Sequence, residues 1–264
     1  MSATTNFLRQ FGDLAVSFDG NAFLSGGMLQ RLTLAVEGNL SLVWAPFEHI
    51  CESARVVIVG ICPGRTQAEN GLHAFRAAIR EGMPIEVALR RAKLTASFSG
   101  AMRTNFIDML DHIGLNQALQ LESCGQLFNA ESEYAHFTSA LRYPVFISGE
   151  NYAGNPDMLQ TPLLRQLIDT ALVEEARVLR RAAWISMGPK PAGALNYLAA
   201  KGILRQDQIL TGVPHPSGAN AERIAYFLGR KERKNLSRKT NPVAIDKARE
   251  ALKLTVAGFA ERGI

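Results

Sequence analysis

Four loops that contain glycine or proline carry the side chains in this sequence that are best suited to chemistry. Three of them follow a short apolar run such as Val56–Val59, which is typical of a strand buried on both faces. Glycine lets a ligand approach the backbone closely, and proline fixes one backbone angle of a turn. The four loops are Gly60–Gly64, Phe98–Gly100, Gly149–Gly154 and His215–Gly218.

Together these loops supply an approachable backbone, an aromatic face, an amide and an imidazole. Such a set suits a flat, polar heterocycle that stacks on Phe98, has its edge read by Asn151 and receives a hydrogen bond or proton from His215. The sequence has no Gly-x-Gly-x-x-Gly or P-loop motif, and its five histidines show no His-x-x-x-His spacing. We therefore expect neither a cofactor nor a metal ion.

The apolar runs indicate the scaffold that would hold these loops. Strand-like runs alternate with helical patterns, which predicts an α/β fold: a three-layer α/β/α sandwich around a mostly parallel sheet of about four strands. Ligands of such sheets lie beyond the carboxyl ends of the strands, so we expect the loops to converge at one edge. The predicted strands are 56–59, 144–148, 183–186 and 209–213, with a further short strand at 40–44.

Apolar residues at helical spacing predict the covering helices. Pro84 and Pro162 stand where helices are expected to begin, because proline is tolerated in a first turn. Residues 230–239 are rich in Lys and Arg, and their pattern favours a solvated linker over a DNA contact. The expected helices are 6–17, 27–36, 72–94 with a break near Pro84, 102–112, 161–179, 192–201, 221–228 and 243–261.

Length, composition and cysteine usage bound the class of protein. The chain has 264 residues, 47% of them hydrophobic, and its net charge of +5 is compatible with a nucleic-acid partner without requiring one. Three scattered cysteines argue against a disulfide framework, and no long apolar run or signal-peptide pattern appears. We expect a soluble, cytoplasmic single domain over 1–264, with a helical lead-in (1–54), a core (55–229) and a basic linker with a C-terminal helix (230–264).

The order of the motifs resembles that of the uracil-DNA glycosylase superfamily. The first motif of that superfamily reads Gly-Gln-Asp-Pro-Tyr or Gly-Glu-Ala-Pro-Gly in different branches, and here Gly60–Gly64 reads Gly-Ile-Cys-Pro-Gly. Its His-Pro-Ser motif corresponds to His215–Ser217. The stretch Ser97–Met102 resembles the segment whose Phe stacks on the flipped base, and Asn151-Tyr152 resembles the segment whose Asn reads the pyrimidine edge.

This resemblance covers roughly residues 54–229 and implies a monofunctional DNA glycosylase, in a repair or antiviral role. Such an enzyme flips an abnormal or modified pyrimidine out of single- or double-stranded DNA, hydrolyses its N-glycosidic bond and leaves an abasic site. The implied catalytic residues are His215, Cys62 and Asn151; the implied base-binding residues are Gly60, Ile61, Pro63, Gly64, Phe98, Asn151 and Tyr152; and the implied DNA-binding residues are Arg65, Arg103, Ser217, Gly218, Asn220 and Arg223.

The first motif departs from the superfamily pattern in two ways. Ile61 and Cys62 stand where other members place a carboxylate or amide that positions water, so that task would fall to the backbone or to another residue; the candidates are Glu69, Asn70 and Glu150. Gly64 stands where the uracil-specific branch has a Tyr that excludes C5 substituents. We therefore expect the site to tolerate pyrimidines substituted at C5, including hypermodified phage bases.

The sequence is also compatible with other functions and with purely structural roles for some of these residues. The missing carboxylate is compatible with a modified-base or uracil-DNA binding protein that has little or no turnover. Cys62 and His215 suggest a Cys–His hydrolase, although Pro63 has no N–H to give to an oxyanion hole. Cys62 could equally be a small buried filler, Phe98 a core residue and Asn151 a turn cap.

Overall fold

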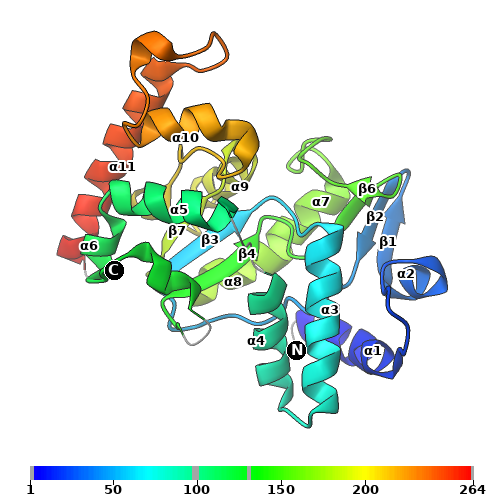
Figure 1. The fold of residues 1–264 in the computed structure, drawn as a ribbon. Helices are drawn as coiled ribbons and strands as arrows, with labels where there is room; N and C mark the ends of the chain where they lie inside the picture. Colours follow the sequence, from blue (N-terminus) through cyan, green and yellow to red (C-terminus); the bar gives the residue numbers. More distant parts are fainter. Residues whose placement is uncertain (1–2, 97–100, 130–131, 263–264) are drawn as a thin grey trace. The chain divides into compact units, whose positions relative to one another are not determined.

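The computed structural model describes residues 3–96, 101–129 and 132–262, and it divides into two compact units (Figure 1). Unit 1 takes its described residues from 1–50, 61–97 and 137–175. Unit 2 takes its described residues from 51–60, 98–136 and 176–264. The chain enters each unit three times, so neither unit is continuous in sequence.

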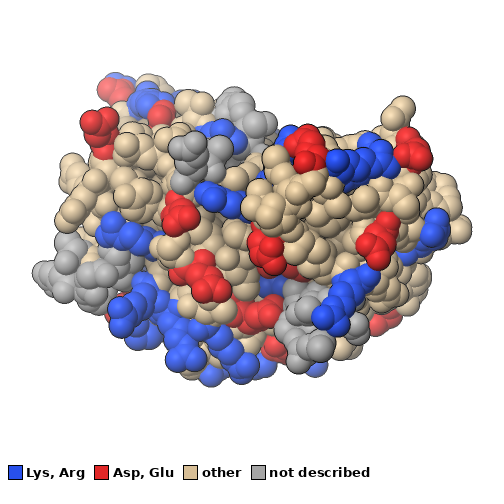
Figure 2. Space-filling view, turned by 90° about the horizontal axis from the view of Figure 1, so that it is seen from below, with Lys and Arg blue, Asp and Glu red and all other residues tan. Residues whose placement is uncertain are grey.

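Charge is distributed unevenly along the sequence. Residues 1–175 contain 12 Lys and Arg against 18 Asp and Glu, whereas residues 176–264 contain 17 Lys and Arg against 6 Asp and Glu. Figure 2 shows Lys and Arg gathered along one margin of the face it displays, while the two signs are interspersed elsewhere. The excess of positive charge therefore belongs to the last third of the chain, which lies in unit 2.

A sheet with parallel strands forms the centre of unit 2. Its strands β3 (Val56–Gly60), β7 (Ala183–Ser186) and β8 (Ile209–Leu210) are parallel neighbours. Residues 56–59 and the whole of β7 are buried, as their apolar runs predicted. The sheet order is β4-β3-β7-β8, and β4 (Ala135–Ser139) was not predicted because polar residues interrupt its apolar run.

Helices from the last part of the chain complete unit 2 near the predicted positions. α9 (Pro189–Ala200) follows β7 and packs on it. The apolar side chains Ile224 and Phe227 on α10 and Phe259 on α11 are buried. The remaining helices of this unit are α5 (Ala101–His112), α6 (Leu115–Leu119), α10 (Ala221–Phe227) and α11 (Pro242–Arg262).

Unit 1 contains an antiparallel sheet that corrects two expectations. The predicted helix 27–36 ends early, since α2 (Gly26–Leu32) is followed directly by strand β1 (Thr33–Glu37). The predicted strand 144–148 forms as β5 (Val145–Ile147), but it pairs antiparallel with β2 (Leu40–Val43) and does not join the parallel sheet. The order of this sheet is β1-β2-β5-β6, with β6 spanning Glu150–Asn151.

Two tight turns explain why these strands pair with each other. Gly38, at φ +60°, opens the two-residue turn between β1 and β2. Ser148 and Gly149, at φ +50° and +87°, form the two-residue turn between β5 and β6. Two-residue turns with positive φ match the twist of antiparallel hairpins. The local turn therefore sets the register of β5 with β6, which an apolar run does not reveal, whereas β5 and β2 pair over a long separation in sequence.

The helices of unit 1 follow the predicted pattern with shifted boundaries. α3 (Arg65–Arg80) and α4 (Ile85–Ala96) are separated at Gly82-Met83-Pro84, as Pro84 predicted, but α3 begins directly after Gly64. The predicted helix 161–179 is α7 (Pro162–Leu167), a π-helical turn (Ile168–Leu172) and α8 (Val173–Val178) in succession. α1 (Ala3–Ser17) packs against α3.

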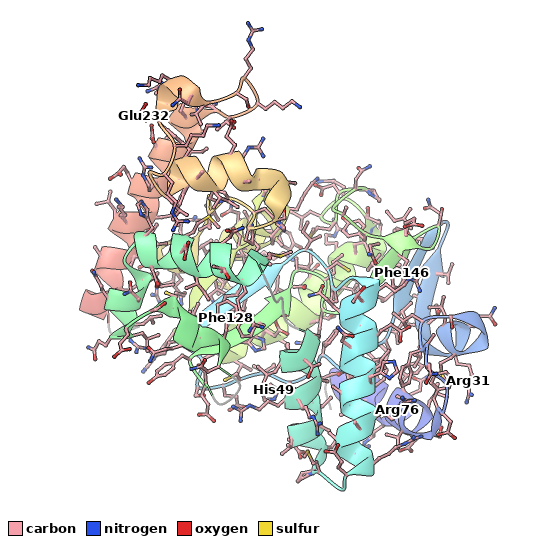
Figure 3. The ribbon with its side chains drawn as sticks, in the orientation of Figure 1. Arg31, His49, Arg76, Phe128, Phe146 and Glu232 are labelled. Carbon is pink, nitrogen blue, oxygen red and sulfur yellow. The ribbon has the colours of Figure 1, made fainter. Side chains whose placement is uncertain are left out.

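A buried charged cluster ties α4, the start of α8 and the segment before β5 together inside unit 1. Arg142 donates to Glu174 (3.1 Å), to Glu175 (2.9 Å) and to the Ala171 carbonyl (2.9 Å). Lys93 lies 3.7 Å from Glu175 and donates to the carbonyl of His49, which Figure 3 places beside α4. Burial lowers the pKa of Lys93 to about 8, although the nearby Glu175 raises it.

None of the helices in the described part of the chain combines the length and the apolar character needed to cross a bilayer. Within the same residues, no group of three or more His, Cys, Asp or Glu side chains is placed to hold a metal ion.

Candidate functional site

The loop predicted after β3 is present, and it leads straight into helix α3, which begins earlier than predicted. β3 ends at Gly60, and the chain enters unit 1 at Ile61, whose carbonyl accepts a hydrogen bond from the N–H of Leu141 (3.0 Å). Gly64 precedes the first turn of α3, and its N–H is bonded by the side chain of Gln67 (3.1 Å). Gln67 also donates to the Ala96 carbonyl, so it holds the loop to the end of α4.

Gln67 was not singled out from the sequence, although a signal for it exists. A Gln or Glu three residues after a helix N-cap is the position that bonds back to the N-cap backbone. Gly64 has no side chain to bond the backbone of Gln67, so only the bond from the Gly64 N–H to the side chain of Gln67 forms here. The spacing from Gly64 to Gln67 therefore marks the start of α3, seven residues before the helix that the apolar pattern predicted.

Cys62 occupies a structural position in this loop. Its sulfur accepts a hydrogen bond from the N–H of Val145 (3.1 Å) and lies 3.5 Å from the carbonyl of Tyr143, to which the thiol donates. Burial raises the pKa of the Cys62 thiol to about 12. A thiol that stays protonated is a poor nucleophile, so this geometry speaks against the catalytic role predicted for Cys62 and against a Cys–His hydrolase.

Asn151 lies against the same loop and its amide has a defined orientation. Its Oδ1 accepts the backbone N–H of Arg65 at 2.8 Å, and a backbone donor at that place requires the amide oxygen to face it. The Nδ2 group is left for other partners, on a side chain that is exposed to solvent. The end of the first predicted loop, at Gly64, therefore meets Asn151 of the predicted loop Gly149–Gly154 in unit 1.

A side chain at residue 64 would be in ordinary van der Waals contact with the amide of Asn151. A Cβ at Gly64 would lie 3.4 Å from Asn151 Nδ2 and 3.6 Å from the amide carbon and oxygen. The backbone of Gly64 is extended, at φ −79°, so its conformation does not require glycine. The space beside Gly64, which we expected to be open for a C5 substituent, is bounded on one side by this amide.

Arg65 is held inside unit 1 by three contacts. Its guanidinium donates to the carbonyls of Leu24 and Gly149, and it lies over the ring of Phe146 with its central carbon 4.6 Å from the ring centroid. These contacts fasten the start of α3 to the turn between β5 and β6. A DNA phosphate, which we predicted for Arg65, would have to use the N–H groups that remain.

Two other predicted participants are already engaged. The carboxylate of Glu69 accepts the backbone N–H groups of Phe23 (2.9 Å) and Leu24 (2.7 Å), so both of its oxygens have partners and it is a poor candidate for positioning water. The hydroxyl of Tyr152 donates to the Pro156 carbonyl, and burial raises the pKa of this phenol. Its proposed contact with a base would therefore use the ring and not the hydroxyl.

His215 lies in unit 2, in the loop that follows β8, and its tautomer is set by Ser217. The Nδ1 atom is 3.3 Å from the N–H of Ser217, which donates to it, and 3.0 Å from the Ser217 hydroxyl. Nδ1 is therefore an acceptor, and the proton of the neutral ring resides on Nε2. Burial lowers the pKa of His215, which favours this neutral form.

Gly188 is a second position that sequence reasoning did not assign to the site. It lies at φ +98°, and a Cβ there would be 3.8 Å from both Cβ and Cδ2 of His215. The positive φ favours glycine, and the distances place this turn in van der Waals range of the imidazole. A glycine directly before proline and after a buried strand is the signal that could have identified it.

Hydrogen bonds join three of the predicted DNA-binding residues of unit 2, which are Ser217, Asn220 and Arg223. Asn220 donates to the Ser217 hydroxyl (3.3 Å), and Arg223 donates to Asn220 Oδ1 (2.8 Å). Asn105 holds the same loop through the carbonyl of Pro216 (2.9 Å). Arg103, also in unit 2, has its guanidinium 5.2 Å from the ring centroid of Phe128. His215, Ser217, Asn220 and Arg223 are thus positioned together.

The structure tests the predicted convergence of the four loops separately within each unit. Gly64 and Asn151 meet in unit 1, and His215 and Ser217 meet in unit 2. Phe98, the predicted stacking residue, falls outside the residues that the structure describes. That His215 and Phe98 act on one ligand beside Gly60–Gly64 stays a prediction.

Comparison with known proteins places the chain in a family. No protein-family model matches it, and no solved structure matches it either. The uncharacterized protein YoxB of Bacillus subtilis (strain 168) is 32% identical over 228 residues, which cover 85% of this chain and 89% of that protein. The chain therefore belongs to the same protein family as YoxB.

Proposed function

We propose that this protein is a monofunctional DNA glycosylase of the uracil-DNA glycosylase superfamily, with the three-layer α/β/α arrangement of that superfamily. The single observation that carries the proposal is the geometry of His215. Ser217 and burial together favour a neutral imidazole that presents an Nε2–H donor in the loop after a parallel strand. This is the group that a departing pyrimidine needs.

His215 would act on the negative charge that develops on the base. As the bond between the sugar C1′ and the base nitrogen breaks, its electron pair moves onto the base and accumulates on a carbonyl oxygen. A fixed Nε2–H donor stabilises that oxygen more in the transition state than in the ground state. Removing one such donor typically lowers kcat by about a hundredfold to a thousandfold.

Asn151 would select the base through its two N–H donors. Because Oδ1 is engaged by the backbone of Arg65, Nδ2 is the part of the amide that can approach a ligand. It would donate to a carbonyl oxygen on the pyrimidine edge. A base that lacks an acceptor at that place would leave the amide unpaired, which discriminates strongly against it.

The attacking water has fewer candidate partners than the sequence suggested. Glu69 is engaged with two backbone N–H groups, and Cys62 is neither charged nor a good acceptor. Glu150, exposed in β6 beside Asn151, remains a candidate to orient water. The sugar cation would otherwise form first and be captured by water, with the water proton passing to solvent.

A base-excision screen with purified protein tests this function. Oligonucleotides that carry uracil, 5-hydroxymethyluracil or modified cytosines would be incubated with the protein, and abasic sites would be detected as alkali-labile breaks. We expect breaks with at least one C5-substituted base. Cleavage restricted to uracil would exclude the proposed tolerance at C5, and the absence of breaks from every base in the panel would contradict the glycosylase.

A binding protein specific for modified bases is the second candidate. The observation that favours it is the lack of an acidic or amide side chain in the loop Ile61–Gly64, where neither Ile61 nor the protonated thiol of Cys62 can activate water. Such a protein would shift the mobility of modified oligonucleotides without producing alkali-labile sites. The same screen, read by gel shift and by cleavage, separates the two candidates.

A further inference from the structure

Residues 230–240, here called the basic loop, are fastened to the helix that follows the His215 loop. The loop connects α10 with α11, and Figure 3 shows it, with Glu232 labelled, projecting beyond the ends of these helices. The sequence favoured a solvated linker at this place. A linker would have few contacts of its own, whereas this loop is held at several points along its length.

Glu222 in the first turn of α10 is the main anchor. Its carboxylate accepts hydrogen bonds from Lys231 Nζ (2.9 Å), from the Ser237 N–H (3.2 Å) and hydroxyl (2.7 Å), and from the Thr240 hydroxyl. These bonds lower the pKa of Glu222 to about 2, the side-chain bond from Lys231 contributing most. One side chain thus gathers residues from both ends of the basic loop.

A second anchor joins the loop to the residues beside His215. Arg223 donates to the carbonyl of Lys239 (3.2 Å) and to Asn220 Oδ1 (2.8 Å). Asn220 in turn donates to the hydroxyl of Ser217. The basic loop is therefore continuous, through hydrogen bonds, with the candidate phosphate contacts at Ser217 and Asn220.

The loop carries cations that its anchors do not neutralise. Residues 230–240 contain six Lys and Arg against one Glu. Arg230 pairs with Asp108, Lys231 with Glu222 and Lys234 with Glu232. Across the described part of the chain, no ion pair is formed by three further exposed cations of the loop, which are Arg233, Arg238 and Lys239.

The cations of the loop are held at fixed positions and repel one another when the protein is unbound. A bound polyanion reduces this repulsion. We propose that the basic loop binds the sugar–phosphate backbone of DNA, next to the phosphate contacts of Ser217 and Asn220. This inference rests on the proposed function and deepens it, since it extends the DNA footprint away from the base that is excised. Contacts of this kind fix position and orientation on DNA without reading sequence.

Neutralising the three unpaired cations tests the inference directly. The variant Arg233→Gln, Arg238→Gln, Lys239→Gln would be compared with the unchanged protein for binding to a fluorescent 25-base duplex at several salt concentrations. Each lost phosphate contact lowers the slope of log K against log salt by about 1, so we expect a fall of about 3 and an affinity at least about tenfold weaker at low salt.

The matched control removes the same charge elsewhere in unit 2. Arg177→Gln, Arg180→Gln, Arg181→Gln changes three exposed arginines near the end of α8 and before β7. We expect this variant to keep most of the affinity and the slope. Equal losses in the two triple variants would overturn the inference, because they would show that binding follows total charge and not the basic loop.

A change at Glu222 tests whether the anchored shape matters. Glu222→Ala adds one unit of positive net charge, so simple attraction predicts tighter binding to DNA. If the anchors hold the loop in its binding shape, affinity falls instead, and Glu222→Gln, which keeps some hydrogen bonds, falls less. Tighter binding by Glu222→Ala, with folding intact by circular dichroism, would contradict an anchored loop.

The test of the basic loop and the test of the glycosylase activity can fail independently. Binding is measured here on unmodified DNA, whereas the glycosylase is tested by cleavage of modified bases. Loss of affinity in the loop variant without any cleavage activity in the unchanged protein would support the loop and refute the enzyme. If the unchanged protein cleaves modified DNA and the loop variant binds DNA with unaltered affinity, the enzyme is supported and the role of the loop is refuted.

Discussion

His215 owes its protonation state to the residue two positions later. The Ser217 N–H occupies Nδ1, and burial disfavours the imidazolium, so the ring is neutral with its proton on Nε2. The His-Pro-Ser spacing was visible in the sequence, and it predicted that this histidine follows a strand. The tautomer was not visible, because it depends on where the backbone of Ser217 points after Pro216.

The lowered pKa of His215 leads to a prediction about pH. A histidine pKa below the usual value of about 6.5 keeps the ring neutral at neutral pH, and protonation adds a charge that burial disfavours. Glycosylase activity should therefore be constant around pH 7 and fall on the acid side with one proton, at an apparent pKa below about 6.5. Measuring kcat/KM from pH 4.5 to 8.5 checks this, and a loss of activity centred above pH 7 would show that the neutral ring is not the active form.

Two substitutions at Asn151 test whether its Nδ2 group reads the base. Asn151→Asp keeps an oxygen for the Arg65 N–H but replaces the Nδ2 donors with an acceptor, whereas Asn151→Ala removes both. Losing a hydrogen bond of this kind is worth about 1 to 3 kcal/mol, so excision of a base read through a carbonyl should slow about tenfold to a hundredfold in both variants.

Thermal unfolding distinguishes the two Asn151 variants. Asn151→Asp should keep the melting temperature of the unchanged protein, because the contact with Arg65 survives, and Asn151→Ala should lower it. Unchanged excision by Asn151→Asp would mean that the Nδ2 group does not read the base.

At the scale of elements, apolar runs predicted five of the eight strands that the structure describes, and they did not predict how β5 pairs. Residues 56–59 and 183–186 are buried in the parallel sheet, as expected. β5 was wrongly assigned to that sheet: it pairs with β6 through the turn at Ser148-Gly149 and with the distant β2, and its apolar content indicates neither partner. β4 was missed because Ala135–Ser139 includes polar residues that the fold nevertheless buries, such as His136.

The buried charged cluster of unit 1 makes a prediction about stability. Arg142 has a side-chain exposure of 1% and holds Glu174, Glu175 and the Ala171 carbonyl, and Glu175 is fully buried. Arg142→Ala would leave that carboxylate without its main partner, which costs about 3 to 5 kcal/mol. Urea unfolding monitored by circular dichroism measures the change in the free energy of unfolding.

The exposed Arg165 on α7 is the control for this change. Arg165→Ala should alter the free energy of unfolding by less than about 0.5 kcal/mol, as is usual for surface positions. If Arg142→Ala were as mild as Arg165→Ala, the cluster would not contribute to holding the start of α8 against the segment before β5.

At the scale of the whole molecule, the sequence suggested an anionic partner only through its net charge of +5. The charge is unevenly distributed, because residues 176–264 carry the positive excess. The same residues include His215 and the basic loop, and they lie in unit 2. The loop itself was read as a linker because a run of Lys and Arg gives no sign of the carboxylate that gathers it. Glu222 lies outside the run, and its role depends on the fold.

The most direct test of the central claim is product analysis with the unchanged protein and with His215→Ala on the same modified oligonucleotides. We predict free base and alkali-labile abasic sites with the unchanged protein. With His215→Ala we predict cleavage reduced by at least about a hundredfold, at a DNA affinity within about threefold of the original. Abasic sites formed at equal rates by both proteins would contradict the account, because the imidazole would then have no part in breaking the glycosidic bond.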